Sequence, residues 1–179
     1  MKNKILNFVI IFFIFSISTS NSISEIQFNF DVTNIEILNN GNTFKGSNRG
    51  IITADNGIVI NGDNFKFEKE SNILNVTGNV KIEDTIKNYI IFADNVTYLK
   101  NEELIITKQN SKGVDGEGKI ITADSFKYNK KLNILNAKGQ VNVKDIIQDY
   151  ILNTEEITYL RNEEKIITKG ITKSIIKSK

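Results

Sequence analysis

The 179-residue sequence predicts an all-β protein, and three observations carry this prediction. Isoleucine contributes 32 residues against 9 Leu and 4 Ala, so β-branched side chains outnumber the strong helix formers Ala and Leu. Most of the chain divides into short runs of alternating apolar and polar residues separated by polar turns. No long segment shows the 3.6-residue period of an amphipathic helix.

The runs belong to an internal repeat of about 61 residues. Its first copy spans Ile60 to Lys112 and its second spans Ile121 to Lys173, with 26 of 53 aligned positions identical and no gap. The front segment, residues 26–60, adds strands of its own. It contains Ile-Thr-Ala-Asp at residues 52–55, which recurs at residues 121–124, so this segment is interpreted as a partial third unit.

Each copy predicts about four strands. In the first copy the alternating runs are Phe65–Phe67, Leu74–Ile82, Tyr89–Leu99 and Leu104–Thr107, and the second copy repeats them 61 residues later. Gly78 and Gly139 interrupt the second run of each copy, which predicts a bulge or bend there. The acidic and glycine-rich segment 114–118 is interpreted as a linker between the copies.

Side chains of one parity within each run are predicted to face inward, where the residues alone indicate no more than a core. They are Leu74, Val76, Val80, Ile82, Phe92, Val96, Tyr98, Leu135, Val141, Val143, Ile157 and Tyr159. A repeated unit of this kind buries its apolar face against its neighbours, either in a β-helix or between two facing sheets.

Four residue types are absent from the chain: Pro, Cys, Trp and His. Disulfides, zinc sites of the Cys/His type and His-dependent catalysis are therefore excluded, and we expect no enzyme, no metal and no cofactor. The net charge of +2 is evenly distributed, which argues against a nucleic-acid partner. Without proline, the terminal strands lack one common device that blunts free sheet edges.

Some charged residues could suggest a site, but their positions favour ordinary roles. Asp63, Asp94 and Asp124 stand at strand ends near turns, where a hydrogen-bonding role in the turn is expected. The basic residues of the turns are candidates for contact with lipid phosphates, although solvation is the expected state: Lys100, Lys130, Lys131 and Arg161.

Residues 1–22 are predicted to be a secretory signal peptide, followed by one β domain over residues 23–179. Lys2 and Lys4 precede an apolar run from Ile5 to Ile17, and small polar residues follow. The run is shorter than the roughly 20 residues that span a bilayer. Export without cysteine fits a periplasmic protein stabilised by an ordinary core.

The repeat resembles the OstA/LptA family of lipopolysaccharide-transport proteins. The resemblance rests on Ile-Thr-Ala-Asp-x-Phe-x-Tyr (121–128), Asn-Ile-Leu-Asn-Ala-x-Gly-x-Val-x-Val (133–143), and Ile-Thr-Tyr (157–159) with a closing Ile-Ile-Thr-Lys-Gly (166–170). It covers roughly residues 50–173. The first copy departs from the pattern at 61–62, where Asn-Gly replaces Thr-Ala, and at 76–77, where Val-Thr replaces Ala-Lys.

The resemblance implies an open, twisted β-jelly roll of two facing antiparallel sheets. It also implies that the twelve inward-facing residues line, at least in part, a hydrophobic groove for lipopolysaccharide acyl chains. Members of the family stack end to end through terminal strands and form a bridge between the inner and outer membranes, so further jelly-roll components, or further copies of this chain, are the implied partners. The implied localisation is the periplasm, with possible association with the outer membrane.

Two alternatives remain open on the sequence. The chain resembles the front domain of the larger outer-membrane lipopolysaccharide-assembly protein of the LptD type, and a downstream reading frame encoding many amphipathic strands would identify it as such a fragment. A structural β-solenoid without lipid binding is the other alternative, although only two full copies of the repeat are present.

Overall fold

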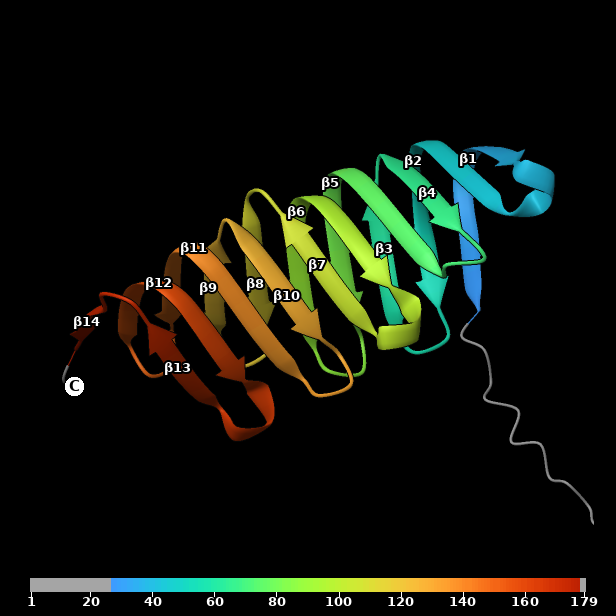
Figure 1. Ribbon diagram of the computed structural model, residues 1–179. Coiled ribbons are helices and arrows are strands. Elements are labelled where there is room, and N and C mark those ends of the chain that lie inside the picture. Colours follow the sequence, from blue (N-terminus) through green and yellow to red (C-terminus); the bar gives the residue numbers. More distant parts are fainter. Residues whose placement is uncertain (1–26, 178–179) are drawn as a thin grey trace, which may run out of the picture.

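The computed structural model describes residues 27–177, which form one antiparallel sheet of 14 strands extending from one end of the molecule to the other (Figure 1). Within this range the helical pieces are single 3-10 turns at Asn39–Gly41, Lys100–Glu102 and Arg161–Glu163. The all-β prediction is confirmed. The strands are β1 (Phe28–Leu38), β2 (Thr43–Ala54), β3 (Ile58–Gly62), β4 (Asn64–Glu68), β5 (Ile73–Asp84), β6 (Tyr89–Leu99), β7 (Leu104–Lys108), β8 (Ser111–Asp115), β9 (Lys119–Ala123), β10 (Ser125–Asn129), β11 (Ile134–Asp145), β12 (Tyr150–Leu160), β13 (Lys165–Lys169) and β14 (Lys173–Ile176).

The structural unit is a hairpin of about 30 residues, half the length of the sequence repeat. Equivalent strands begin at Phe28, Ile58, Tyr89, Lys119 and Tyr150. Successive segments pair with their neighbours in chain order, so the chain runs up and down across the sheet. The front segment contributes β1 and β2 to the same pattern, and the predicted linker at 114–118 is instead the end of β8 and the turn that follows it.

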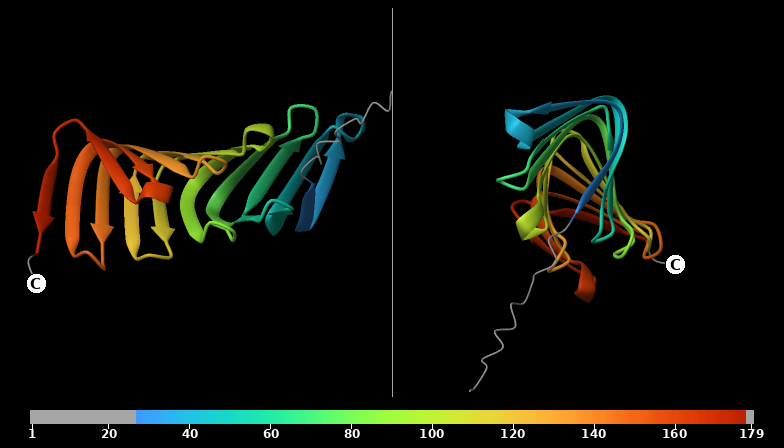
Figure 2. Two further views of the ribbon diagram at one scale, coloured as in Figure 1. Left: turned by 90° about the horizontal axis from the view of Figure 1, so that it is seen from below. Right: turned by 90° about the vertical axis from the view of Figure 1, so that its right-hand side faces the viewer.

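The sheet is folded lengthwise along a line that we call the corner, so that its two halves face each other. In β5, Ile73–Thr77 pair with β4, whereas Lys81–Asp84 pair with β3. Figure 2 shows the result end-on as an arch whose two arms meet at the corner. Sheet I comprises residues 34–38, 43–47, β4, 73–77, 95–99, β7, β10, 134–138, 156–160 and β13. Sheet II comprises residues 28–32, 50–54, β3, 80–84, 89–93, β8, β9, 141–145, 150–154 and β14.

Residues with left-handed backbone conformation make the corner. Gly78 (φ 79) and Asn79 (φ 47) interrupt β5, and Gly139 (φ 80) interrupts β11 at the equivalent point. The register of the β5–β6 pairing shifts there, which confirms the bend predicted from the two glycines. A left-handed conformation is unfavourable for most residues with a Cβ atom, so the corner restricts which residues can occupy it.

Carboxylates support the corner from the neighbouring strands. Asn79 Nδ2 donates to Asp63 Oδ2 at 2.8 Å, and Asn110 Nδ2 donates to Asp94 Oδ2 at 2.6 Å. A Cβ atom at Gly139 would overlap the carboxylate of Asp124. Asp63 and Asp94 therefore have the hydrogen-bonding role expected from their positions, and the Asp124 carboxylate lies beside Gly139 at the equivalent place.

The two ends of the sheet are free edges among the described residues. β1 pairs only with β2, while β13 and β14 each pair only with β12. Isoleucines are exposed at both ends, including Ile35 and Ile37 on β1 and Ile175 and Ile176 on β14. The predicted signal peptide lies outside the described residues, and within residues 27–177 no helix has the length and apolarity needed to cross a membrane.

We expect Gly139→Ala to destabilise the protein by about 1–3 kcal/mol, because it combines a left-handed backbone with a collision against Asp124. Gly41→Ala is the matched control. Gly41 also has a positive φ (87), but a Cβ there meets nothing within 4 Å, so we expect a cost of about 1–2 kcal/mol at most. Urea unfolding followed by circular dichroism measures both costs. Equal costs would show that the carboxylate does not restrict the corner.

Candidate functional site

The space between the two sheets is an apolar interior. Eleven of the twelve residues predicted to face inward do so, and each of these is at most 3% exposed. They come from both sheets, so the structure brings them together across one core. Sheet I contributes Leu74, Val76, Val96, Tyr98, Leu135, Ile157 and Tyr159, and sheet II contributes Val80, Ile82, Val141 and Val143.

The twelfth residue, Phe92, was wrongly predicted to face inward. Phe92 is 36% exposed on the outer surface of sheet II, where Lys112 Nζ lies 5.9 Å from its ring centroid. The cause is the corner. There Gly78 and Asn79 of β5 lie opposite the single residue Asp94 of β6. The alternation of β6 therefore changes phase at Asp94, so Ile91 and Ala93 face inward before it and Val96 and Tyr98 after it.

Side chains fill the interior. Large residues that the sequence analysis did not select also lie there, among them Phe65, Phe67, Phe126 and Tyr128. At the N-terminal end the Phe28 ring centroid is 5.1 Å from that of Phe67 and 5.9 Å from that of Tyr98. An apolar ligand could therefore enter only if the sheets move apart and give up some of these contacts.

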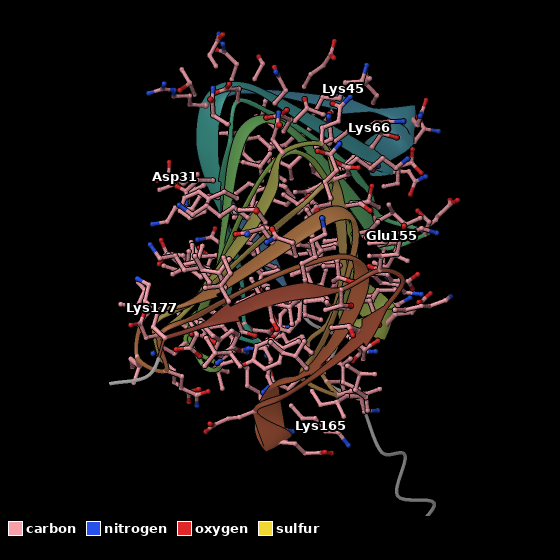
Figure 3. All side chains as sticks on the ribbon, turned by 90° about the vertical axis from the view of Figure 1, so that its left-hand side faces the viewer. Asp31, Lys45, Lys66, Glu155, Lys165 and Lys177 are labelled. Atoms are coloured by element: carbon pink, nitrogen blue, oxygen red, sulfur yellow. The ribbon has the colours of Figure 1, made fainter. Side chains whose placement is uncertain are left out.

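Opposite the corner lies the mouth, the side where the hairpin turns of the two sheets approach each other. In Figure 3, which views the molecule from its C-terminal end, Lys165 and Lys177 mark the ends of the two sheets at this side. Three buried aspartates occupy equivalent positions on the sheet II side of the mouth: Asp84, Asp115 and Asp145. In each, Oδ1 accepts two backbone N–H bonds from residues two to four positions further along the chain, which leaves Oδ2 to face the mouth.

Tyrosines of sheet I reach across the mouth to these groups. Tyr128 donates to Asp84 Oδ2 at 3.0 Å, and Tyr159 donates to Asp115 Oδ2 at 3.1 Å. At the N-terminal end the same place is taken by an amide, because Asn56 Nδ2 donates to the Tyr98 hydroxyl at 2.8 Å. These contacts join opposite sheets, so they hold the mouth closed at three successive levels.

Basic side chains complete the mouth instead of lying in solvent as expected. Lys130 Nζ is 3.9 Å from Asp84 Oδ1, and Lys119 Nζ is 2.9 Å from Asp145 Oδ2. Lys100, which is 5% exposed, places Nζ 5.2 Å from the ring centroid of Phe28. Lys131 is exposed, as predicted.

Arg161 also joins the two sides. Its Nη1 donates to Asn133 Oδ1 at 2.6 Å on its own side, and its Nη2 donates to the Lys87 carbonyl at 3.1 Å across the mouth. The guanidinium carbon lies 4.2 Å from the ring centroid of Tyr89. Three buried polar atoms of the mouth have no partner among the described residues: Arg161 Nε, the Tyr89 hydroxyl and Asn56 Oδ1. The polar network of the mouth is therefore incompletely satisfied.

Burial shifts the ionisation of the mouth groups. Burial raises the pKa of all five tyrosines, reaching about 12 for Tyr98 and for Tyr159, where nearby Asp115 adds to the effect. For Asp145, burial opposes ionisation but is outweighed by hydrogen bonds from the Gln148 N–H and from Lys119, and the pKa is lowered. All five hydroxyls are therefore protonated at neutral pH, and those of Tyr128 and Tyr159 donate across the mouth.

The sequence analysis did not identify the aspartates of the mouth. A signal was present, because Asp84 aligns with Asp145 and Tyr98 with Tyr159 in the two copies of the repeat. In residues 27–177 no group of three or more acidic side chains converges as a metal ion would require. The candidate site therefore consists of an apolar interior and a mouth closed by polar side chains.

These features define an all-β protein whose folded sheet encloses an apolar interior. No protein-family model and no curated protein matches the chain. Among solved structures, the fold is similar to that of LptH from Pseudomonas aeruginosa, described as the LptA homologous periplasmic component of the conserved lipopolysaccharide transport device. The TM-score is 0.58 at 12% sequence identity, with 63% of this chain and 82% of that chain covered. The chain therefore has an LptA-like jelly-roll fold.

We expect absorbance titration at 295 nm to show no tyrosine of the folded protein ionising at the ordinary pKa of about 10. In the unfolded chain all tyrosines ionise there. Because the folded pKa values are raised, the neutral hydroxyls contribute full stability below about pH 10, and this contribution is lost as the pH rises further. The urea midpoint should fall between about pH 10 and 12. A folded-state titration step near 10 would contradict the buried mouth.

Proposed function

We propose that this chain is a non-enzymatic, periplasmic carrier of lipopolysaccharide, which holds acyl chains in the interior as part of a bridge between the inner and outer membranes. The observation that carries the proposal is the apolar interior enclosed by an LptA-like fold. The secretory layout of residues 1–22 supports an exported protein.

The chemistry of an acyl chain fits this interior. Acyl chains have no hydrogen-bonding groups, and each buried methylene contributes about 0.8 kcal/mol, so diffuse apolar contact is enough to hold them. The interior provides such contact along the length of the sheet, from Phe28 in β1 to Tyr159 in β12. No nucleophile or general base is required, which agrees with a chain that lacks His and Cys.

The free edges support the proposed end-to-end assembly. β1 at one end and β13 with β14 at the other have backbone groups without a strand partner among residues 27–177. An added strand from another jelly-roll component would satisfy them by β-augmentation. The exposed isoleucines at both ends would be covered by the same contact.

We expect a photo-crosslinking amino acid placed at Val80 or Val141 to capture lipopolysaccharide in the mature chain, because both side chains face the interior from sheet II. The matched control is the same probe at Phe92, which lies in sheet II but faces outward. Capture is read as a mass shift on a denaturing gel. Equal capture at Phe92, or none at Val80 and Val141, would favour a structural protein without lipid binding.

We expect the protein to self-associate through its ends in a concentration-dependent way. The double variant Ile37→Lys, Ile176→Lys should raise the dissociation constant at least tenfold. These isoleucines are 58% and 75% exposed on the terminal strands, and a charge on an edge strand opposes pairing. Sedimentation velocity of the mature chain measures the effect. Ile147→Lys is the control, because Ile147 is 65% exposed but lies in a turn of the mouth. A monomer at every concentration would exclude pairing between copies of this chain.

A further inference from the structure

The contacts across the mouth repeat with the fold. Tyr128 and Tyr159 each bond an aspartate 44 residues earlier in the chain, and Tyr98 bonds Asn56, 42 residues earlier. All three bonds join the inner face of sheet I to the mouth side of sheet II. We call these three pairs the latch.

The corner and the mouth hold the sheets together by different means. At the corner the six long strands, β1, β2, β5, β6, β11 and β12, are continuous from sheet I to sheet II, and their backbone ladders extend to both sides of it. At the mouth, every hydrogen bond and ion pair from sheet to sheet among the described residues involves a side chain. Opening at the mouth would therefore break no strand pairing, and the corner would serve as the hinge.

The filled interior requires such an opening. The eleven predicted interior residues that face inward are at most 3% exposed, so an acyl chain has no free volume among them unless the sheets separate. Because the sheets are joined at the corner, the largest separation for a given rotation occurs at the mouth.

The hydrogen bonds of the latch can break at low cost in free energy. When the mouth opens, each tyrosine hydroxyl and carboxylate can exchange its partner for water, so the net loss per hydrogen bond is small. The closed mouth already contains three buried atoms without a partner, Arg161 Nε, the Tyr89 hydroxyl and Asn56 Oδ1, which opening would hydrate. The closed mouth is thus held by side-chain contacts of small net free energy, whereas the corner is held by the continuous backbone.

From this arrangement we infer that the latch gates the interior, and that acyl chains enter sideways through the mouth when the bonds from Tyr128 to Asp84 and from Tyr159 to Asp115 open. This inference rests on the proposed function for the nature of the ligand. The opening itself is a property of the protein alone and can be measured without lipid.

The test removes latch hydroxyls and retains the rings. Tyr128→Phe and Tyr159→Phe, singly and together, each delete one bond across the mouth. Tyr89→Phe is the matched control, because the Tyr89 hydroxyl is buried in the same region without a hydrogen-bond partner. Urea unfolding confirms that each variant is folded, and the single variants serve if the double variant is not.

Opening is measured between spin labels on cysteines introduced at Ile86 and Leu132. These residues are 65% and 57% exposed, lie in mouth turns of sheets II and I respectively, and occur in a chain without native cysteine. Entry is measured in unlabelled protein by stopped-flow fluorescence of cis-parinaric acid, a free fatty acid. Each lost hydroxyl should raise the open population and the entry rate about fivefold, as expected for one net hydrogen bond.

The expected result is a longer, broader label distance and faster entry for the two latch variants, and neither increase in Tyr89→Phe, whose lost hydroxyl bonds nothing in the closed mouth. Unchanged distances and rates in folded latch variants would overturn the inference, as would equal changes in Tyr89→Phe. A wider mouth without faster entry would place entry at the ends of the sheet, and would also overturn it. Failure of the proposed function is separate: it appears as absent lipopolysaccharide capture at Val80 and Val141 in the unaltered protein.

Discussion

The lengthwise fold of the sheet at the corner is the constraint on which the rest of the molecule depends. A flat antiparallel meander with no second layer would leave its apolar face in water. Left-handed residues such as Gly78, Asn79 and Gly139 turn the long strands at the same level, and Asp63 accepts a hydrogen bond from Asn79 there. The two halves of one sheet thereby cover each other, and the chain acquires a core without a second layer.

The corner also determines the character of the opposite side. Since the sheets diverge from the corner, their hairpin turns must meet or remain open to water. Here the turns meet through buried polar groups, with Asp84 and Asp115 bonded both to their own turns and to tyrosines of the facing sheet. A buried polar group is costly when it has no partner. This closure therefore requires that the side chains of the two sheets lie directly opposite each other, which an apolar closure would not require. In a molecule closed in this way the two sheets are joined covalently at the corner and only by side-chain contacts at the mouth.

Much of the fold follows from local pattern. Bent strands with an apolar inner face are correctly predicted by three features: the alternation along β5 and β11, the glycines at their bends and the repeat itself. Phe92 shows where parity fails, because the alternation of β6 changes phase at Asp94 in the corner. The mouth could not be predicted in the same way. Its pairs lie about 44 residues apart, on strands that are not adjacent in either sheet.

The sequence by itself determined the strands, the bends and the apolar composition of one face, because these depend on side chains near one another along the chain. Only the tertiary structure decided which side chains lie opposite each other when the sheet closes. That choice depends on the rotation at the corner and on the stagger between the two sheets. For this reason Lys100 and Lys130, ordinary turn residues in the sequence, lie buried at the mouth, and Asp115, placed in an apparent linker, bonds Tyr159 across it.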